Sequence, residues 1–454
     1  MTAVPPPATV PQRLIRLALP VVGLNMLNVL ALAVDTAMVG RLPQPEAALT
    51  GLGFGTQFLF ILMVLMMGVS VGSVAIVARA FGAGDMALVN RQLAQSMMLT
   101  VLLGLGVGLA GNLLAPVYLD LVAARGEARE AALTYLRPLL LGTVFNYLTI
   151  LLGSVLRGVR NTRLAFQVAV VSNLVNFGIN WLLILGNAGA PRLGVLGASI
   201  GTLMSQISAL VMILGALFWG AVPGLRPPTR PVPIDRAGAW ALIRIGAPAA
   251  LDMVVLNAGF LSIISMLGRL DPLAVAAHGI GLRIQALAFV PGMGISQATG
   301  ALVGNALGAG KPEEARAVAR ASVGLSALTM GVLAVMIIVP APWILGLFHV
   351  EAAGPLGQHA TTWIRLLGLC MPLAGVHIAL AGTFQGAGAT RLSLRLNVLS
   401  TLLVQVPVSF LLGFPLGFGP LGVWGGFPVS FLAKAGLAIH AFRKGDWLNA
   451  APRR

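Results

Sequence analysis

The chain has 454 residues, of which 57% are hydrophobic and 9% charged, whereas soluble domains carry about 25% charged residues. This composition excludes a soluble globular protein and predicts a polytopic membrane protein. Its long apolar runs lack the alternation of β-barrel strands, so we expect all-α spans. The net charge is +16, and the basic residues lie in short loops between the apolar runs. This distribution is typical of residues that set membrane topology, and it argues against nucleic-acid binding.

Residues 1–12 are proline-rich and predict a disordered cytoplasmic tail rather than a signal peptide, because the apolar run behind them is too long. The next stretch, 13–41, can cross a bilayer, which takes about 20 helical residues, and contains the acid Asp35. An aspartate inside a membrane helix costs roughly 3 kcal/mol on insertion scales, and burial disfavours its charged form. We interpret Asp35 as a proton or sodium site. The alternative is an acid that only holds helices together.

Hydropathy predicts twelve spans. They cover residues 14–40, 50–78, 93–118, 133–156, 164–187, 195–221, 243–268, 273–302, 318–340, 361–385, 396–414 and 420–442. Basic residues gather in the loops after the even-numbered spans, as with Arg157, Arg160 and Arg163 after the fourth. The positive-inside rule therefore places both termini in the cytoplasm.

A proline-rich stretch, PGLRPPTRPVPIDRAGAW at 223–240, lies halfway along the chain and predicts an extended cytoplasmic linker. It separates an N-terminal six-helix lobe at 13–222 from a C-terminal six-helix lobe at 241–443. Residues 444–454 form a C-terminal tail in this interpretation.

An internal repeat relates the two halves. A shift of 228 residues joins Arg16–Pro20 to Arg244–Pro248 and Gly194–Gly197 to Gly422–Gly425, and two further motifs match within roughly two residues of that shift. An even number of spans in each half makes the repeat parallel. We therefore expect two pseudo-symmetric six-helix bundles around a central cavity.

Further polar residues interrupt the spans. Asp252, four residues past Pro248, is a candidate second acidic site or an ordinary group that snorkels to the interface near Arg244. Arg283 in the eighth span and His377 in the tenth are candidate polar groups of the cavity. For His377 a structural role is the alternative to proton transfer.

The fifth span carries Asn173, Asn176 and Asn180 at spacings of three and four, which puts all three on one helix face. Amides on one face can coordinate a cation or hydrogen-bond a protonated acid. Contacts between helices are the alternative, because asparagine often serves that purpose in membranes. Their location in the same half as Asp35 favours a function.

Several motifs together resemble the multidrug and toxic compound extrusion family over almost the whole chain. They are VDTAMVG at 34–40, VARAFGAGD at 77–85, VLRGVRNTR at 155–163, AVAAH at 274–278 and PGMGISQATGALVGNALGAGKPEEA at 291–315. The resemblance implies two six-helix lobes, a V-shaped cavity, and export of cationic or amphipathic compounds driven by inward proton or sodium flow.

The resemblance also assigns residues. Asp35 matches the acid of the family's first helix, and Asn176 and Asn180 match positions of the fifth helix that join it in a polar network. Thr202 in the sixth span matches a further member of that network. Some relatives have aspartate where Asn180 stands, so the choice of ion can differ.

The second half departs from the family branch that binds a cation in the C-terminal lobe. The expected glutamate of the seventh helix is Leu256 here, and the acid of the tenth helix is replaced around Ala374. The departure favours coupling through the N-terminal lobe, with Asp252 as a separate candidate.

The sequence thus predicts an antiporter of the bacterial inner membrane, multi-pass and monomeric, with H⁺ or Na⁺ as coupling ion. It predicts no other cofactor and no structural metal; a Na⁺ ion would bind Asp35, Asn176 and Asn180. The alternative is a flippase for a lipid-linked cell-wall or oligosaccharide precursor, which needs several cavity arginines where only Arg283 is a clear candidate. No catalytic motif appears in the spans, so we expect no enzyme.

Overall fold

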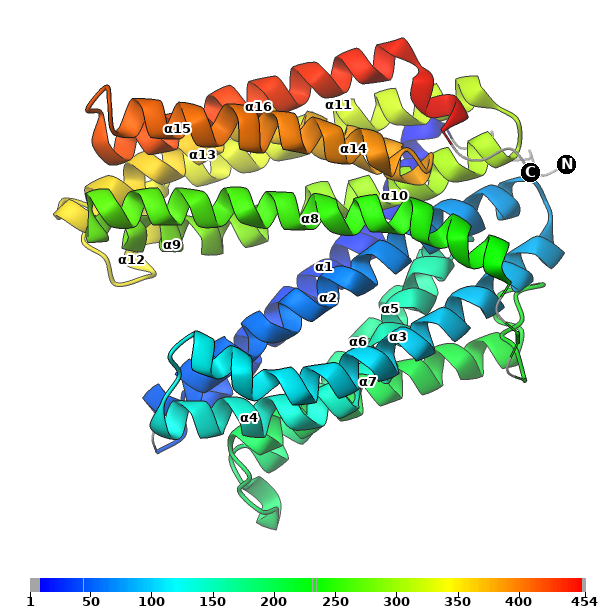
Figure 1. Cartoon of the computed structure of the whole chain (residues 1–454), viewed down its shortest axis with the longest axis horizontal. Coiled ribbons are helices and arrows are strands. Elements are labelled where there is room, and N and C mark those ends of the chain that lie inside the picture. The colour runs from blue at the N-terminus through cyan, green and yellow to red at the C-terminus, as the bar shows by residue number, and fades with distance from the viewer. Residues whose placement is uncertain (1–8, 44, 231, 234, 451–454) are drawn as a thin grey trace, which may run out of the picture. The chain divides into compact units, whose positions relative to one another are not determined.

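The computed structural model describes residues 9–43, 45–230, 232–233 and 235–450, and all regular secondary structure in this part of the chain is helical (Figure 1). The described residues form two compact units. The N-terminal unit is Gly23–Ala247, and the C-terminal unit combines the chain up to Val22 with Pro248 onward. The division therefore falls inside two helices, next to the repeat-related prolines Pro20 and Pro248. The lobe boundaries at 13–222 and 241–443 stay a prediction.

The N-terminal unit contains most of α1 and the first turns of α8. Its complete elements are α2 (Pro45–Gly82), α3 (Met86–Leu121), α4 (Gly126–Leu141), α5 (Thr143–Gly158), α6 (Thr162–Leu183), the short helix η1 (Asn187–Gly189) and α7 (Val195–Phe218). The shared helix α1 covers Val10–Val39 and begins inside the predicted tail, of which residues 1–8 lie outside the described residues.

The C-terminal unit contains the rest of α8 (Arg236–Leu270). Its complete elements are α9 (Pro272–Ala288), α10 (Val290–Gly308), α11 (Pro312–Ile338), α12 (Ala341–Gly346), α13 (Pro355–Gly386), α14 (Thr390–Asn397), the π-helix η2 (Val398–Gln405), α15 (Val406–Gly413), α16 (Gly419–Lys444) and η3 (Asp446–Asn449). Residues 451–454 of the predicted C-terminal tail lie outside the described residues.

The predicted polytopic all-α fold is confirmed. Ten described helices are long and apolar enough to span a membrane, or up to 12 if each of two bent pairs is one span. The fourth predicted span bends by 58° between α4 and α5, and the eighth bends by 43° between α9 and α10. At the first bend the Leu203 side chain packs against Gly142, in the space that a Cβ on residue 142 would occupy. Pro291 at the second bend lacks an N–H and disfavours helical geometry in the residue before it.

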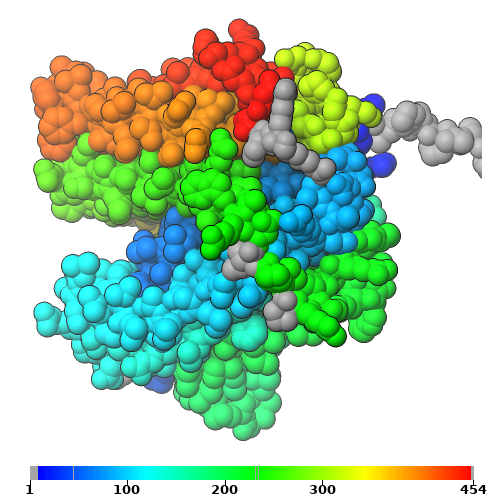
Figure 2. Space-filling model, turned by 45° about the vertical axis from the view of Figure 1, so that its right-hand side comes forward, coloured from blue at the N-terminus to red at the C-terminus, as the bar shows by residue number. Residues whose placement is uncertain are grey.

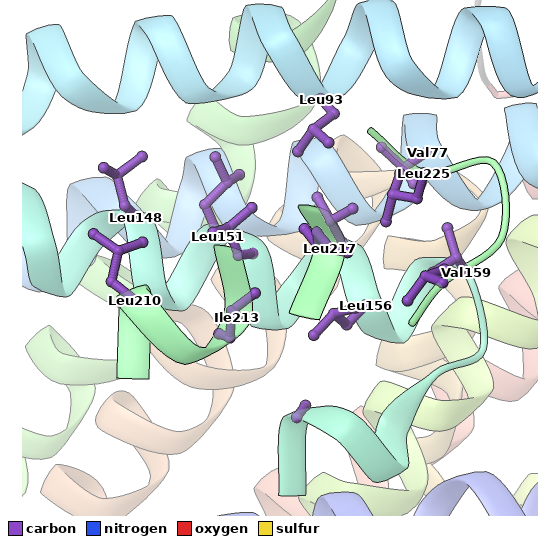
Figure 3. Close-up of a cluster of buried hydrophobic side chains, with 14 of the residues drawn as sticks. Val77, Leu93, Leu148, Leu151, Leu156, Val159, Leu210, Ile213, Leu217 and Leu225 are labelled. Carbon is purple, nitrogen blue, oxygen red and sulfur yellow. The ribbon is translucent and has the colours of Figure 1, made fainter. Parts of the chain in front are cut away.

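The core of the N-terminal unit is a continuous apolar cluster. Aliphatic side chains from α2, α3, α5 and α7 point toward one another, as Figure 3 shows for Leu93, Leu151 and Ile213. Leu225, which follows α7, is 1% exposed and completes the cluster. The beginning of the linker is therefore part of this core.

Matching hydrogen bonds show the repeat in three dimensions. Ser73 Oγ donates to Ser96 Oγ at 3.1 Å in the N-terminal unit, and the hydroxyls of Thr299 and Ser322 lie 2.5 Å apart in the C-terminal unit. Both pairs join residues 23 apart in the sequence. Each unit thus fixes its second and third spans together at an equivalent buried point.

Two amide side chains of α3 hold the linker. Asn90 donates to Gly224 O at 2.9 Å and accepts from Arg226 N at 2.9 Å, and Gln95 donates to Pro233 O at 2.8 Å and accepts from Asp235 N at 2.9 Å. The green linker surface accordingly lies against the blue-to-cyan surface of α3 in Figure 2. The described part of the linker is therefore anchored to the N-terminal unit at two points, Gly224 with Arg226 and Pro233 with Asp235.

Replacing Gln95 with alanine is expected to loosen this anchor. The change removes two hydrogen bonds worth about 1 kcal/mol each and leaves two backbone groups unpaired. Because proteolysis follows the population of the opened segment, limited trypsin cleavage in the linker should accelerate by about thirtyfold, the factor that corresponds to about 2 kcal/mol. Gln92→Ala is the matched control, since the Gln92 Oε1 atom on the same helix has no hydrogen-bond partner. Equal cleavage rates in the two variants would contradict the anchor.

Candidate functional site

Asp35 and the asparagine face of the fifth predicted span meet in the N-terminal unit. Asn180 Nδ2 on α6 donates to Asp35 Oδ1 on α1 at 2.6 Å, and it lies 3.3 Å from Asn176 Oδ1. Asn180 is fully buried and Asn176 is 6% exposed, whereas Asp35 is half-buried. The structure thus brings together three of the four residues that the sequence predicted for the coupling site. Their roles stay predictions.

Asn173 and Thr202 do not form part of this hydrogen-bonded set. The Asn173 side chain donates to Ala169 O at 2.7 Å, and the Thr202 hydroxyl donates to Ala198 O at 3.0 Å, so each bonds its own helix. The contact from α7 comes instead from the neighbouring Gly201, where an added Cβ would overlap Asn180 Oδ1. Sequence analysis missed Gly201, because a glycine in an apolar span carries no polar signal.

A cavity of about 190 Å³ lies in the same unit. Its wall combines apolar side chains with hydroxyl and amide groups. It is lined by Thr56, Leu59, Phe60, Leu62, Met63, Tyr135, Leu139, Thr143, Asn146, Tyr147, Thr202 and Gln206. Gln206 Oε1 is buried without a hydrogen-bond partner, so it remains available as an acceptor. Such a mixed wall suits an amphipathic small molecule.

Tyr135 connects this cavity to the acid. It lines the cavity, its hydroxyl hydrogen-bonds Thr56, and it interacts electrostatically with Asp35. Tyr135 is 8% exposed, so the interaction takes place largely away from water, where charges interact more strongly. A change of charge on Asp35 therefore changes the field at the cavity wall.

Asp252 on α8 lies in a second polar cluster, in the C-terminal unit. Asn397 Nδ2 donates to Asp252 Oδ1 at 2.7 Å, and Ser393 Oγ donates to Asp252 Oδ2 at 3.1 Å. Asp252 is 3% exposed, which excludes the snorkelling alternative for this side chain. Lys434 on α16 is buried too and interacts electrostatically with Asp252.

The two other predicted polar residues have different surroundings. His377 on α13 lies beside Asn397 and within electrostatic range of Lys434. Arg283 on α9 is exposed and does not belong to this cluster. Lys434 was missed because a lysine two turns from the end of a span is typical of a side chain that snorkels to the interface.

The ligand set around Asp35 fits H⁺ or a small monovalent cation. The carboxylate of Asp35 and the amide oxygen of Asn176 both face Asn180 Nδ2. Oxygen ligands of this kind suit hard cations. Na⁺ would need Asn180 to turn its amide so that an oxygen replaces the donor, whereas protonation of Asp35 changes a single hydrogen bond.

The fold, with one carboxyl–asparagine cluster in each unit, is that of a helical membrane protein built from two related halves. The model of the MatE family matches residues 20–182 and again 248–411, and so the chain belongs to the MatE family. The two matches begin 228 residues apart, which confirms the repeat seen in the sequence. They also confirm the resemblance to the multidrug and toxic compound extrusion family.

Curated relatives align over nearly the whole chain. A probable multidrug resistance protein NorM of Thermotoga maritima is 27% identical over 445 residues, covering 97% of this chain and 94% of the relative. The multidrug resistance protein PmpM of Pseudomonas aeruginosa is 26% identical over 432 residues, covering 93% of this chain and 89% of the relative.

Solved structures confirm the fold. An outward-facing multidrug resistance MATE family transporter of the MOP superfamily matches with a TM-score of 0.89 at 22% identity, covering 98% of this chain and 97% of that one. A MATE structure in the bent conformation matches with a TM-score of 0.87 at 22% identity, covering 98% and 96%.

Proposed function

We propose that this protein is a secondary antiporter that exports amphipathic or cationic compounds in exchange for H⁺ or Na⁺ by alternating access. The observation that carries the proposal is the hydrogen bond of 2.6 Å between Asn180 and Asp35. It lies in the unit that holds the amphipathic cavity, and Tyr135 of the cavity wall interacts electrostatically with Asp35. The bacterial relatives are named as multidrug resistance proteins, which supports the substrate class.

Coupling follows from the charge on Asp35. Loading with H⁺ or Na⁺ removes the negative charge, weakens the bond from Asn180 and changes the field on Tyr135. The ion at Asp35 thereby changes the affinity of the cavity for the exported compound. By linkage, the compound changes the affinity of Asp35 for its ion by the same factor. Asn176 and Asn180 hold the loaded ion, and Thr202 contributes to the cavity wall.

The protein works as a monomer in the bacterial plasma membrane with both termini in the cytoplasm, and it needs no cofactor other than its coupling ion. It moves its substrates without chemical change and is not an enzyme. The flippase alternative is not favoured, because Arg283 is exposed and the named relatives are multidrug resistance proteins.

The test measures ethidium efflux from proteoliposomes under an inward pH gradient and then under an inward Na⁺ gradient. Ethidium is a permanently charged amphipathic cation whose fluorescence reports its location. We expect one of the gradients to drive efflux well above that of protein-free vesicles. If neither gradient drives efflux of ethidium or of a neutral amphipathic dye, the proposed antiport is wrong.

A further inference from the structure

The cluster around Asp252 repeats the arrangement around Asp35. The two asparagine–aspartate bonds, Asn180 to Asp35 and Asn397 to Asp252, both join residues 145 apart. A shift of 217 residues carries Asp35 onto Asp252, Asn176 onto Ser393 and Asn180 onto Asn397. The same helix pair of each repeat, its first and fifth spans, therefore carries a carboxyl, an asparagine that donates to it and one further polar residue in the same relative register. The further residue differs in its contact, since Ser393 donates to Asp252 whereas Asn176 contacts Asn180.

This register differs from that of the sequence repeat. The repeat shift of 228 exceeds 217 by eleven residues, so the C-terminal trio lies three turns nearer the beginnings of its own two helices. Eleven residues correspond to about 16 Å along a helix axis. Because acid and amide moved by the same number of residues on parallel helices, their contact is preserved at a new position.

In both clusters the asparagine keeps an unused acceptor. Asn180 Oδ1 and Asn397 Oδ1 are buried without a hydrogen-bond partner, and Asn397 is 2% exposed. A deprotonated carboxylate cannot satisfy a carbonyl oxygen, since it has no donor. A protonated carboxyl can donate to that oxygen once the amide turns. A protonated carboxyl therefore supplies a donor to this acceptor that the carboxylate does not have.

The C-terminal cluster has its own counter-charge. Lys434 is 6% exposed and lies over the Phe431 ring with its ammonium 5.3 Å from the centroid. It interacts electrostatically with Asp252 from α16 and with His377 from α13. Lys434 takes part in none of the ion pairs within 4.0 Å that the described residues form. Two opposite charges are thus buried near each other without direct contact, which a membrane protein rarely tolerates without a function.

An irregular helix follows this cluster directly. Asn397 ends α14, and the π-helix η2 begins at Val398. Short π-helical segments often occur at functional sites. A change in the bond between Asn397 and Asp252 therefore acts on a segment that can change its hydrogen-bond register.

We propose that Asp252, with Ser393, Asn397 and Lys434, is a second proton-exchange site, which rests on the proposed antiport. A proton adds to the Asp252 carboxylate to form the neutral acid, while the Lys434 ammonium keeps its charge over the Phe431 ring. Release of that proton restores the carboxylate and its opposite charge, so the site gains and loses one proton in each cycle. The site takes H⁺ and excludes Na⁺, because the Lys434 ammonium already supplies the positive charge beside the carboxylate.

The test counts protons and does not depend on transport. Purified protein in nanodiscs is titrated from mildly acid to mildly alkaline pH with a pH-indicator dye. The double variant Asp252→Asn/Lys434→Met removes both charges together, so no unpaired buried charge destabilises it. We expect it to bind about one proton fewer than wild type over this range, with a thermal unfolding midpoint close to that of wild type.

The matched control is Asp446→Asn/Lys444→Met, which removes an equivalent pair at an exposed site where the two groups lie 2.9 Å apart. It leaves the Asp252 cluster unchanged, so the loss of about one bound proton should be confined to the Asp252/Lys434 double variant. If the Asp252/Lys434 double variant also titrates like wild type, the cluster is only structural and the inference is wrong. A failure of Asp35→Asn to affect efflux would overturn the proposed antiport instead, and so the two failures are distinguishable.

Discussion

Asp35→Asn is expected to reduce gradient-driven ethidium efflux to the level of protein-free vesicles while the protein stays folded. Asparagine has the shape of aspartate, and its side-chain oxygen can still accept the bond that Asn180 Nδ2 donates at 2.6 Å. The packing of α1 against α6 is therefore retained. What is lost is the group that changes charge, and without it neither a proton nor a sodium ion can be exchanged at this position.

The measurement compares efflux with the thermal unfolding midpoint of the same preparations. Asp120→Asn is the matched control, because it makes the same chemical change at an exposed acid that is paired with Arg129 at 3.0 Å, and exposed pairs contribute little to stability. It should retain wild-type efflux. Full efflux by Asp35→Asn under the driving gradient would exclude Asp35 as the coupling group.

Composition and periodicity predicted the helical architecture because long apolar runs have few alternatives in a membrane. The bends were harder to predict. Pro20, Pro116 and Pro372 lie inside continuous helices, so a proline in a span does not by itself mark a break. At Gly142 the bend coincides with the approach of Leu203 from α7, a contact between distant segments that no local pattern contains.

The site around Asp35 could be predicted because an acid and amides are rare inside apolar spans and therefore conspicuous. Only some residues of the cluster around Asp252 could be predicted from the sequence. Asp252 and His377 were candidates, but Ser393, Asn397 and Lys434 were not. The repeat shift of 228 pairs Asp252 with Leu24, and so aligning the halves conceals the correspondence. The correspondence between Asp35 and Asp252 is found only when the structure shows that each contacts an asparagine 145 residues further along the chain.

Gly201→Ala is expected to impair the site without changing any polar residue. A Cβ at position 201 would overlap Asn180 Oδ1, so the amide must move away from α7 and lose its alignment with Asp35. Overpacking of this kind costs about 1–3 kcal/mol. We expect efflux to fall several-fold and the driving gradient needed for half-maximal efflux to rise, because Asp35 then holds its ion in a distorted site.

Gly178→Ala is the matched control, since Gly178 lies between Asn176 and Asn180 on α6 and a Cβ there would meet nothing within 4 Å. Replacing a glycine inside a helix by alanine stabilises it by about 0.5–1 kcal/mol, so this variant should be as active as wild type and slightly more stable. The two substitutions add the same methyl group on neighbouring helices and differ only in whether it meets Asn180. If both variants retain full efflux, the position of the Asn180 amide does not control coupling, and the polar network around Asp35 serves only to pack α1, α6 and α7.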